Sequence, residues 1–339
     1  MKKQALLNAL EIVKPGLANP GLANKEIIEQ STSFAFMEGR VVTYNDEISI
    51  SHPVEGLEIT GAIQAAELYL ILKKIKQEDI EVEITESEVL LTAGRVKVGL
   101  TLQTEIKLPL EEIGSITKWK TLPEEFLQAM KMAMYSCGTN NSEPVLTCVH
   151  VNEIGFIEGS DGFRVMKTTL PNKMPVRTFL ISASVVNNLI KMNPIKVSNG
   201  EGWVHFKTEL GTVMYCRIFE ESFPETSELL KVKGTEFTFP KTINQILDRA
   251  SVFHKQESDT VDAIIALENN RIKISSQSDT GRFEEEANIK YDGKKLEFEI
   301  VPMLLKNILA SVLTCRFNGR ILKFTGDNWE FITLVKAGK

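Results

Sequence analysis

The residues best suited to chemistry are few and scattered in this chain. The four cysteines, Cys137, Cys148, Cys216 and Cys315, form no C-x-x-C pair, and only Cys148 and His150 lie two residues apart on one predicted strand. Two ligands do not make a zinc site, which takes three or four protein side chains. We therefore expect buried thiols in a reducing compartment, and we predict no metal and no cofactor.

Three aspartates are the other candidates for chemistry, because they recur at nearly equal spacing. Asp46, Asp161 and Asp279 are separated by 115 and 118 residues, and each falls in a predicted turn. An aspartate side chain can accept hydrogen bonds from its own backbone, so this placement favours a role in the turn over catalysis. A P-loop and the motifs G-x-G-x-x-G, G-x-S-x-G and H-E-x-x-H are also missing from the sequence. We therefore predict no catalytic residues and no enzyme.

The elements that must position these residues repeat about every 115 residues. Each unit is predicted to begin with an amphipathic helix, to continue through two strands joined by a turn, and to close with a second helix and a hairpin. Pro123 suits the first turn of a helix, and Ser182 suits an N-cap. The first helices are expected at residues 4–17, 123–137 and 241–253, the second at 62–75, 182–192 and 302–313, and the hairpins at 81–102, 196–219 and 315–335.

This repeat predicts an α+β protein of three similar domains, each with two helices packed on antiparallel sheets. The expected boundaries are residues 1–114, 115–232 and 233–339, with linkers where charges, glycine and proline interrupt the pattern. Such units leave sheet edges open at both ends of the chain. Pairing of these edges between two copies can close a ring.

The charge of the chain is unevenly distributed over its predicted elements. The net charge is -6, but the predicted helices with their flanking residues carry twelve basic and five acidic side chains. Helices that all faced one side would attract phosphate there, whereas the acidic strands would repel it. Lysines at the C-terminal ends of helices also complement the helix dipole, which is the plainer explanation for any one of them.

The composition is that of a water-soluble protein. Apolar residues make up 43% and charged residues 25% of the 339 residues, and no apolar run reaches the roughly 18 residues that a membrane helix needs. Asn8, Glu11 and Lys14 interrupt the N-terminal apolar segment too soon for a signal peptide. We therefore expect a cytoplasmic protein with no membrane partner.

Several segments together resemble the bacterial-type DNA sliding clamp, the beta subunit of DNA polymerase III. Ser160-Asp161-Gly162-Phe163-Arg164-Val165 is similar to the T-D-G-H-R-L segment of that family, and Ser222-Phe223-Pro224-Glu225 to its F-P-D segment. Three further segments resemble the third-domain helix, the G-E-A-E-E and Y-x-G run, and the S-G-R strand of the first domain. They are Leu247-Asp248-Arg249-Ala250, residues 279–293 and residues 93–98.

The resemblance implies a head-to-tail homodimer of three-domain chains that encircles duplex DNA without sequence preference. It also implies a peptide pocket for DNA polymerase and clamp loader. The matching pocket positions are Leu146, Ser160, Gly162, Phe163, Arg164, Val165, Pro224 and Leu229, with Ile332 and Leu334 from the last strand. The side chains expected to face DNA are Lys14, Lys73, Lys74, Lys76, Lys131, Lys191, Lys196, Arg249, Lys255 and Lys306.

The chain also departs from the pattern of the family. It ends in Leu334-Val335-Lys336-Ala337-Gly338-Lys339 in place of M-P-M-R-L, Phe163 stands where histidine is common, and Ser227-Glu228 replaces a basic pair. These departures indicate a divergent member and are compatible with a phage origin. The alternative from another class is a repeat-built interaction scaffold that never encircles DNA.

Overall fold

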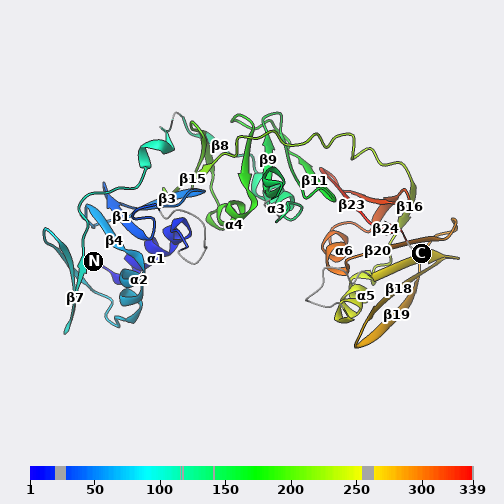
Figure 1. The fold of residues 1–339 in the computed structure, drawn as a ribbon, viewed down its shortest axis with the longest axis horizontal. Coiled ribbons are helices and arrows are strands. Elements are labelled where there is room, and N and C mark those ends of the chain that lie inside the picture. Colours follow the sequence, from blue (N-terminus) through cyan, green and yellow to red (C-terminus); the bar gives the residue numbers. More distant parts are fainter. Residues whose placement is uncertain (20–27, 115, 117, 140–141, 254–262, 338–339) are drawn as a thin grey trace. The chain divides into compact units, whose positions relative to one another are not determined.

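The computed structural model describes the chain except residues 20–27, 115, 117, 140–141, 254–262 and 338–339. Over the described residues, one succession of helix, four strands, helix and three strands occurs three times (Figure 1). The first copy contains α1 (Lys3–Val13), β1 (Ser33–Met37), β2 (Arg40–Tyr44), β3 (Ile48–Pro53), β4 (Gly61–Gln64), α2 (Ala65–Lys74), β5 (Glu81–Ile84), β6 (Glu88–Ala93) and β7 (Val96–Thr101).

The second and third copies each begin with an additional short strand, before the first helix. The second contains β8 (Lys120–Thr121), α3 (Phe126–Met134), β9 (Cys148–Asn152), β10 (Phe156–Ser160), β11 (Arg164–Thr169), β12 (Phe179–Ser182), α4 (Ala183–Met192), β13 (Lys196–Asn199), β14 (Trp203–Lys207) and β15 (Val213–Arg217). The third contains β16 (Thr235–Thr238), α5 (Ile243–Ala250), β17 (Ala263–Glu268), β18 (Arg271–Ser278), β19 (Gly281–Asn288), β20 (Leu296–Ile300), α6 (Pro302–Leu309), β21 (Thr314–Phe317), β22 (Ile321–Thr325), β23 (Trp329–Leu334) and β24 (Lys336–Ala337).

The chain divides into two compact units. The first comprises Met1–Lys131, Cys148–Gly155 and Pro171–Glu221, and the second comprises Met132–Thr147, Phe156–Leu170 and Ser222–Lys339. The three predicted domain boundaries stay a prediction, although the order of elements repeats with the predicted period.

The first unit contains an antiparallel sheet with the strand order β4-β1-β2-β3-β15-β14-β13-β8 and a separate sheet β5-β6-β7. Helix α1 packs on β2 and β3, α2 packs on β1 and β4, and the two helices contact each other. The spacing of three and four between Leu6, Leu10 and Val13 places these side chains on one face of α1, where they are buried.

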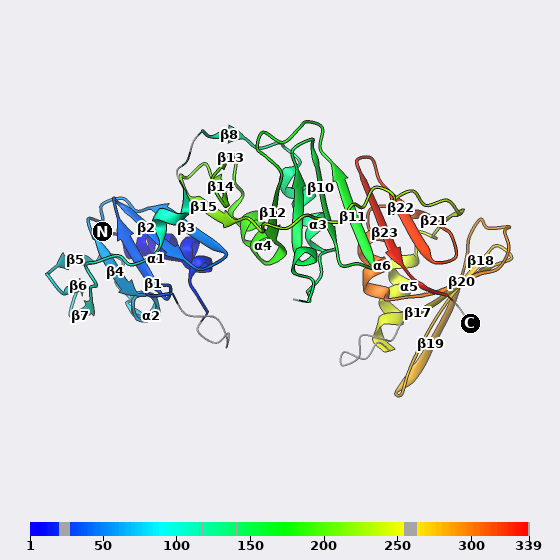
Figure 2. The same cartoon turned by 45° about the horizontal axis from the view of Figure 1, so that its top comes forward.

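The second unit contains consecutive strands in the order β10-β11-β23-β22-β21-β16 and a five-stranded sheet β19-β18-β17-β20-β24. Helices α5 and α6 lie side by side (Figures 1 and 2), and α5 also packs on β18 and β19. Ile243, Ile246 and Leu247 on α5 are almost fully buried in a core shared with Leu305 of α6.

Two strand pairs occupy equivalent places in these sheets, because β2-β3-β15-β14-β13-β8 and β10-β11-β23-β22-β21-β16 have the same order. We call the pairing of β3 with β15 the first seam and the pairing of β11 with β23 the second seam. Across the first seam Ser49 lies opposite Tyr215, which lies opposite His205 on β14. Across the second, Val165 lies opposite Ile332, which lies opposite Lys323 on β22.

The structure confirms the α+β class but corrects several predicted elements. Pro123 precedes α3 instead of starting it, because the helix begins at Phe126. Residues 62–64 belong to β4 and not to the helix that follows. Each predicted closing hairpin is a set of three strands. Ser182 is the predicted N-cap, and its side chain accepts a hydrogen bond from the Ser184 amide.

The observed helices are shorter than predicted, and this weakens the charge partition without reversing it. The six described α-helices carry seven lysines and arginines against three acidic residues. Lys14 and Lys76 lie just beyond the ends of α1 and α2. The helices therefore remain the basic part of an acidic chain.

Candidate functional site

The turn between β10 and β11 holds four of the predicted pocket residues. Asp161 Oδ1 accepts hydrogen bonds from the amides of Phe163 (2.9 Å) and Arg164 (2.8 Å), as expected for a turn aspartate. In the equivalent turn of the first copy, Asn45 and not Asp46 accepts the corresponding pair of amide bonds. Gly162 has φ +84°, a left-handed conformation that favours glycine, and its Cα faces Leu146.

The turn is further braced by the side chains on either side of it. The buried Ser160 hydroxyl donates to the Arg164 carbonyl (2.8 Å) and accepts from the Gly162 amide (3.1 Å). Arg164 Nε donates to Asp161 Oδ2 at 2.6 Å, so this guanidinium is already engaged by a carboxylate. As a result the turn is rigid, and it presents Phe163 with 69% of its surface exposed.

The second seam brings the turn next to the last long strand. Val165 lies opposite Ile332, and the Leu334 amide donates to the Phe163 carbonyl at 2.8 Å. Val165 and Ile332 form an apolar cluster with Leu230 and Val232. The pocket residues predicted from β11 and β23 are therefore brought together by strand pairing.

Residues 222–232 lie along this seam and are held there by charged side chains. The Thr226 hydroxyl donates to the buried Glu158 carboxylate, whose Oε2 is 3.5 Å from Lys167 Nζ. Lys323 Nζ donates to the Leu230 carbonyl at 2.7 Å and pairs with Glu330. Fixing the segment in this way leaves Leu229 53% exposed beside the buried cluster.

Sequence reasoning missed several residues that build this site. The sequence pattern assigns no role in the pocket to Leu230, Val232, Glu158, Lys167 or Lys323. The alternation of Leu230 and Val232 was the one available signal, because apolar residues two apart are typical of a half-buried extended segment. Pro224 is exposed on the same segment, and Leu334 is half-buried at the end of β23.

Two of the four predicted DNA-facing lysines of the first helix pair lie over one aromatic ring. Lys14 Nζ and Lys73 Nζ each lie 4.4 Å from the centroid of Tyr69. Lys73 also pairs with Glu11 at 3.7 Å, and its pKa is raised by its contact with Tyr69 and by Glu11. Lys74 and Lys76 are exposed and form no ion pair with the described residues.

The cations of the helix pair α5 and α6 are instead matched by acids. Arg249 donates two hydrogen bonds to Glu285, at 2.8 and 2.7 Å, and this contact raises the pKa of the guanidinium. Lys306 pairs with Asp248. Lys131, Lys191 and Lys196 are exposed on α3, α4 and β13, and Lys255 lies outside the described residues.

Other predicted chemistry can be checked against the described part of the chain. All four cysteines are buried, as predicted, and burial raises the pKa of Cys216 and Cys315. In the same residues, no cluster of three or more histidine, cysteine or acidic side chains could hold a metal ion. The helices described are all too short or too polar to cross a membrane.

The repeated succession of helices and sheets and the strand order across the two seams define the fold of the DNA sliding clamps. The sliding clamp of Bacillus subtilis matches with a TM-score of 0.82 at 18% identity, over 100% of this chain and 98% of that one. The DNA polymerase III beta subunits of Pseudomonas aeruginosa and Thermotoga maritima match with TM-scores of 0.81 and 0.78, each at 15% identity and over 100% of this chain and 99% of theirs. No protein-family model and no curated protein sequence matches the chain. The resemblance drawn from the sequence is therefore confirmed at the level of the fold.

Proposed function

We propose that this chain is a DNA polymerase processivity factor, a non-enzymatic sliding clamp of the cytoplasm. Two copies would join head to tail around duplex DNA, without sequence preference, and would tether DNA polymerase and other partners such as a clamp loader. The observation that carries the proposal is the presence of two complementary open strand edges, one in each compact unit.

The repeat itself indicates which edges these are. The third strand after the first helix of a copy is β3, β11 or β19, and the third strand after its second helix is β7, β15 or β23. Within the chain, β3 pairs with β15 and β11 pairs with β23, both antiparallel. Eight described strands are at sheet ends, and two of them belong to these series: β19, whose one neighbour is β18, and β7, whose one neighbour is β6. A seam between β19 of one copy and β7 of a second copy would complete the series.

The composition of these two edges supports their pairing. Strand β19 carries one arginine and three glutamates, and these glutamates form ion pairs with Lys273, Arg249 and Arg271 of the same chain. The turn before β7 and β7 itself carry Arg95 and Lys97. Opposite charges across neighbouring strands stabilise a sheet, and like charges destabilise it. An unpaired edge also exposes backbone donors and acceptors that a second strand satisfies.

The first experiment tests this dimer. Arg95→Glu with Lys97→Glu would place like charges on both edges, so we expect a dimer of the 38.0 kDa chain to become a monomer, measured by native mass spectrometry. Lys173→Glu with Lys233→Glu makes the same change in charge at exposed positions away from both edges and should leave the dimer intact. A wild-type monomer, or a dimer that survives the first pair, would overturn the head-to-tail arrangement.

The second experiment tests encirclement. Protein loaded on a nicked circular duplex should remain bound in high salt and should be released when the circle is cut, because the ring can then slide off an end. Retention on linear DNA with free ends would favour the scaffold alternative. Replacing Lys73, Lys74 and Lys76 by glutamine should flatten the salt dependence of weak binding to short duplexes, since each phosphate contact releases counterions.

A further inference from the structure

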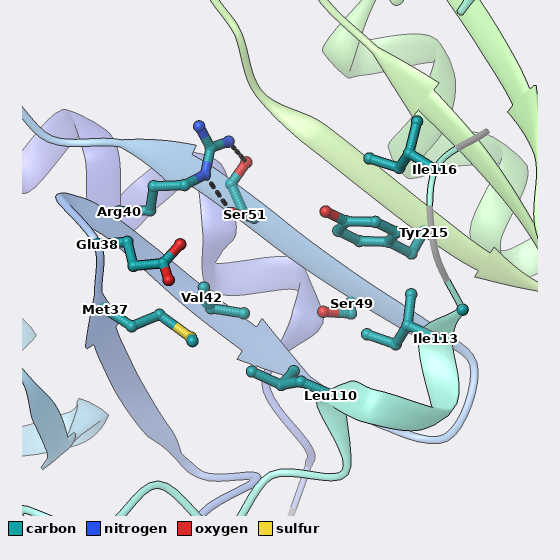
Figure 3. A pocket seen from close by; sticks show the side chains of 11 residues that line it. Met37, Glu38, Arg40, Val42, Ser49, Ser51, Leu110, Ile113, Ile116 and Tyr215 are labelled. Carbon is teal, nitrogen blue, oxygen red and sulfur yellow. Dashed lines mark hydrogen bonds between the residues drawn. The ribbon is translucent and has the colours of Figure 1, made fainter. Parts of the chain in front are cut away.

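A second cavity lies at the first seam, at the place equivalent to the proposed peptide site. It has a volume of about 260 Å³ and is lined by the end of β1, by β2, β3 and β15, and by Leu110, Ile113, Gly114 and Ile116 (Figure 3). Its apolar wall consists of Met37, Val42, Leu110 and Ile113. The cavity is therefore enclosed on one side by the sheet and on another by the segment that leaves the first copy.

The cavity at the first seam and the proposed peptide site at the second seam also have equivalent hydrogen bonds. Buried His205 Nε2 donates to the Ile113 carbonyl at 3.1 Å, just as Lys323 Nζ donates to the Leu230 carbonyl. His205 lies opposite Tyr215, and Lys323 lies opposite Ile332. Residues 110–113 and residues 226–232 are thus held over equivalent strands by equivalent side-chain bonds to the backbone.

Two hydrogen-bond donors line the cavity above its apolar wall. Arg40 Nε and Nη2 donate to Ser51 and Gly211, at 2.6 to 3.0 Å, and Nη1 has no partner among the described residues. No described carboxylate forms an ion pair with this half-buried guanidinium, although the Glu38 carboxylate also lines the cavity, on the same side as Arg40 (Figure 3). The Tyr215 hydroxyl points into the cavity (Figure 3) and has no described hydrogen-bond partner.

Resting on the proposed clamp function, we propose that this cavity is a second peptide-docking site, specific for a partner segment in which one large apolar side chain adjoins a carboxylate. The side chain would enter against Val42, Leu110 and Ile113, and the carboxylate would accept from Arg40 and Tyr215. Arginine recognises carboxylates well, and a partly desolvated guanidinium without an acidic partner favours an anion. The volume lies just below the range of about 300–1,000 Å³ typical of ligand pockets, so one anchoring residue fits.

The test uses the full-length protein and two small probes that differ only in charge. N-acetyl-leucine carries the apolar side chain and the carboxylate, and N-acetyl-leucine amide lacks the charge. We expect N-acetyl-leucine to shift the methyl NMR signals of Val42, Leu110 and Ile113 and the amide to bind about tenfold more weakly, since hydrogen bonds to charged groups are the strong ones. Equal binding of both probes, or shifts confined to Leu229 and Ile332, would overturn the proposal.

Two variants show whether N-acetyl-leucine binds at this cavity or at the second seam. Tyr215→Phe removes only the hydroxyl and should weaken N-acetyl-leucine binding severalfold, while Leu229→Ala should leave it unchanged. A blocked tetrapeptide with leucine next to aspartate should bind more tightly than N-acetyl-leucine; loss of binding on this extension would mean that the cavity takes a small acid and not a peptide. Binding that persists in a protein unable to stay on circular DNA would disprove the clamp function without disproving the pocket.

Discussion

The two seams have the same strand order and register but carry different side chains at equivalent positions. At the second seam, Glu158 and Lys167 lie opposite each other and engage Thr226 and Ser227 of the overlying segment. At the first seam, the equivalent pair is Val42 and Ser51, which are smaller. The cavity of the first seam therefore occupies the place where charged side chains and the segment meet at the second seam.

This difference shows that repetition of a fold preserves strand register more strictly than side-chain chemistry. The bond from β14 or β22 to the carbonyl of the overlying segment is retained, although histidine provides it once and lysine once. A retained bond with a changed donor indicates that the position of the segment is what the architecture requires. The space beneath the segment is then free to differ between the copies.

The largest expected effect is on stability, and it contrasts the buried apolar cluster of the second seam with the cavity of the first seam. Ile332→Asp buries a charge in the apolar cluster with Val165 and Leu230, so we expect the free energy of unfolding to fall by more than about 4 kcal/mol. Tyr215→Asp places the carboxylate beside Arg40 at the cavity, and its cost should be about 1–2 kcal/mol. Urea denaturation measures both, and equal losses would break the comparison.

A smaller effect is expected from the donor that holds the second segment. Lys323→Met removes the hydrogen bond to the Leu230 carbonyl and the pair with Glu330, and it should cost about 2–3 kcal/mol of unfolding free energy. Lys233→Met, at an exposed position, should cost less than about 0.5 kcal/mol. Similar melting temperatures for the two variants would argue against a holding role for Lys323.

The exposed residues of the second seam should affect binding and not stability. Leu229→Ala or Phe163→Ala should weaken a clamp-binding peptide by roughly 1–3 kcal/mol, because exposed apolar anchors dominate peptide affinity. The melting temperature should barely change, since both side chains are more than half exposed. Leu110→Ala at the first seam is the matched control for that peptide. A fall in melting temperature with unchanged affinity would assign these residues to the core.

The smallest expected effect is a pH dependence of stability that comes from the donor His205 of the first seam and not from the donor Lys323 of the second. Burial lowers the pKa of His205 below its ordinary value of 6.5, and its Nδ1 has no partner among the described residues. The unfolded state therefore binds more protons below pH 6.5, so stability is complete above that pH and declines as the pH falls, by at most about 1.4 kcal/mol per unit for this group. His205→Asn should reduce the decline, measured by melting temperature between pH 7 and 5.

His52 provides the control for that measurement. Its pKa is also lowered, by burial and by Arg40, and its Nδ1 contacts the Thr212 hydroxyl at 2.7 Å. His52→Asn should remove a separate part of the acid sensitivity, so the two substitutions should add. An unchanged pH profile in His205→Asn would mean that the imidazole has the same pKa in the folded and unfolded states.

The order of elements could be read from the sequence because local patterns determine it. Alternation and three-four spacing located the six described α-helices and most of the described strands, and Asp161 marked its turn correctly. Helix ends were less predictable, since Ala62 and Ile63 are apolar residues that suit the buried face of a strand as well as that of a helix. Strand β4 is fixed by its pairing with β1, a contact that no local pattern encodes.

The site could be predicted only in outline for the same reason. The turn residues from 160 to 165 are contiguous and carry a recognisable motif, whereas the support from Glu158, Lys167 and Lys323 depends on side chains that meet across strands. The cavity at the first seam could not be predicted at all, because it forms where the β2–β3 hairpin meets β15 and residues 110–113, which are far apart in sequence. Opposite register is a property of the fold and not of any one segment.

The proposed dimer joins two different strand edges, β7 of one copy and β19 of the other, and this determines how the copies are oriented around the ring. An assembly built by joining one kind of edge to the other always keeps one of each at its ends until it closes. Every copy in a closed ring would then point the same way around it, so the two faces of the ring would differ chemically. Phe163 and Leu229 would appear twice on the same face, and a partner approaching along DNA would meet either both docking sites or neither.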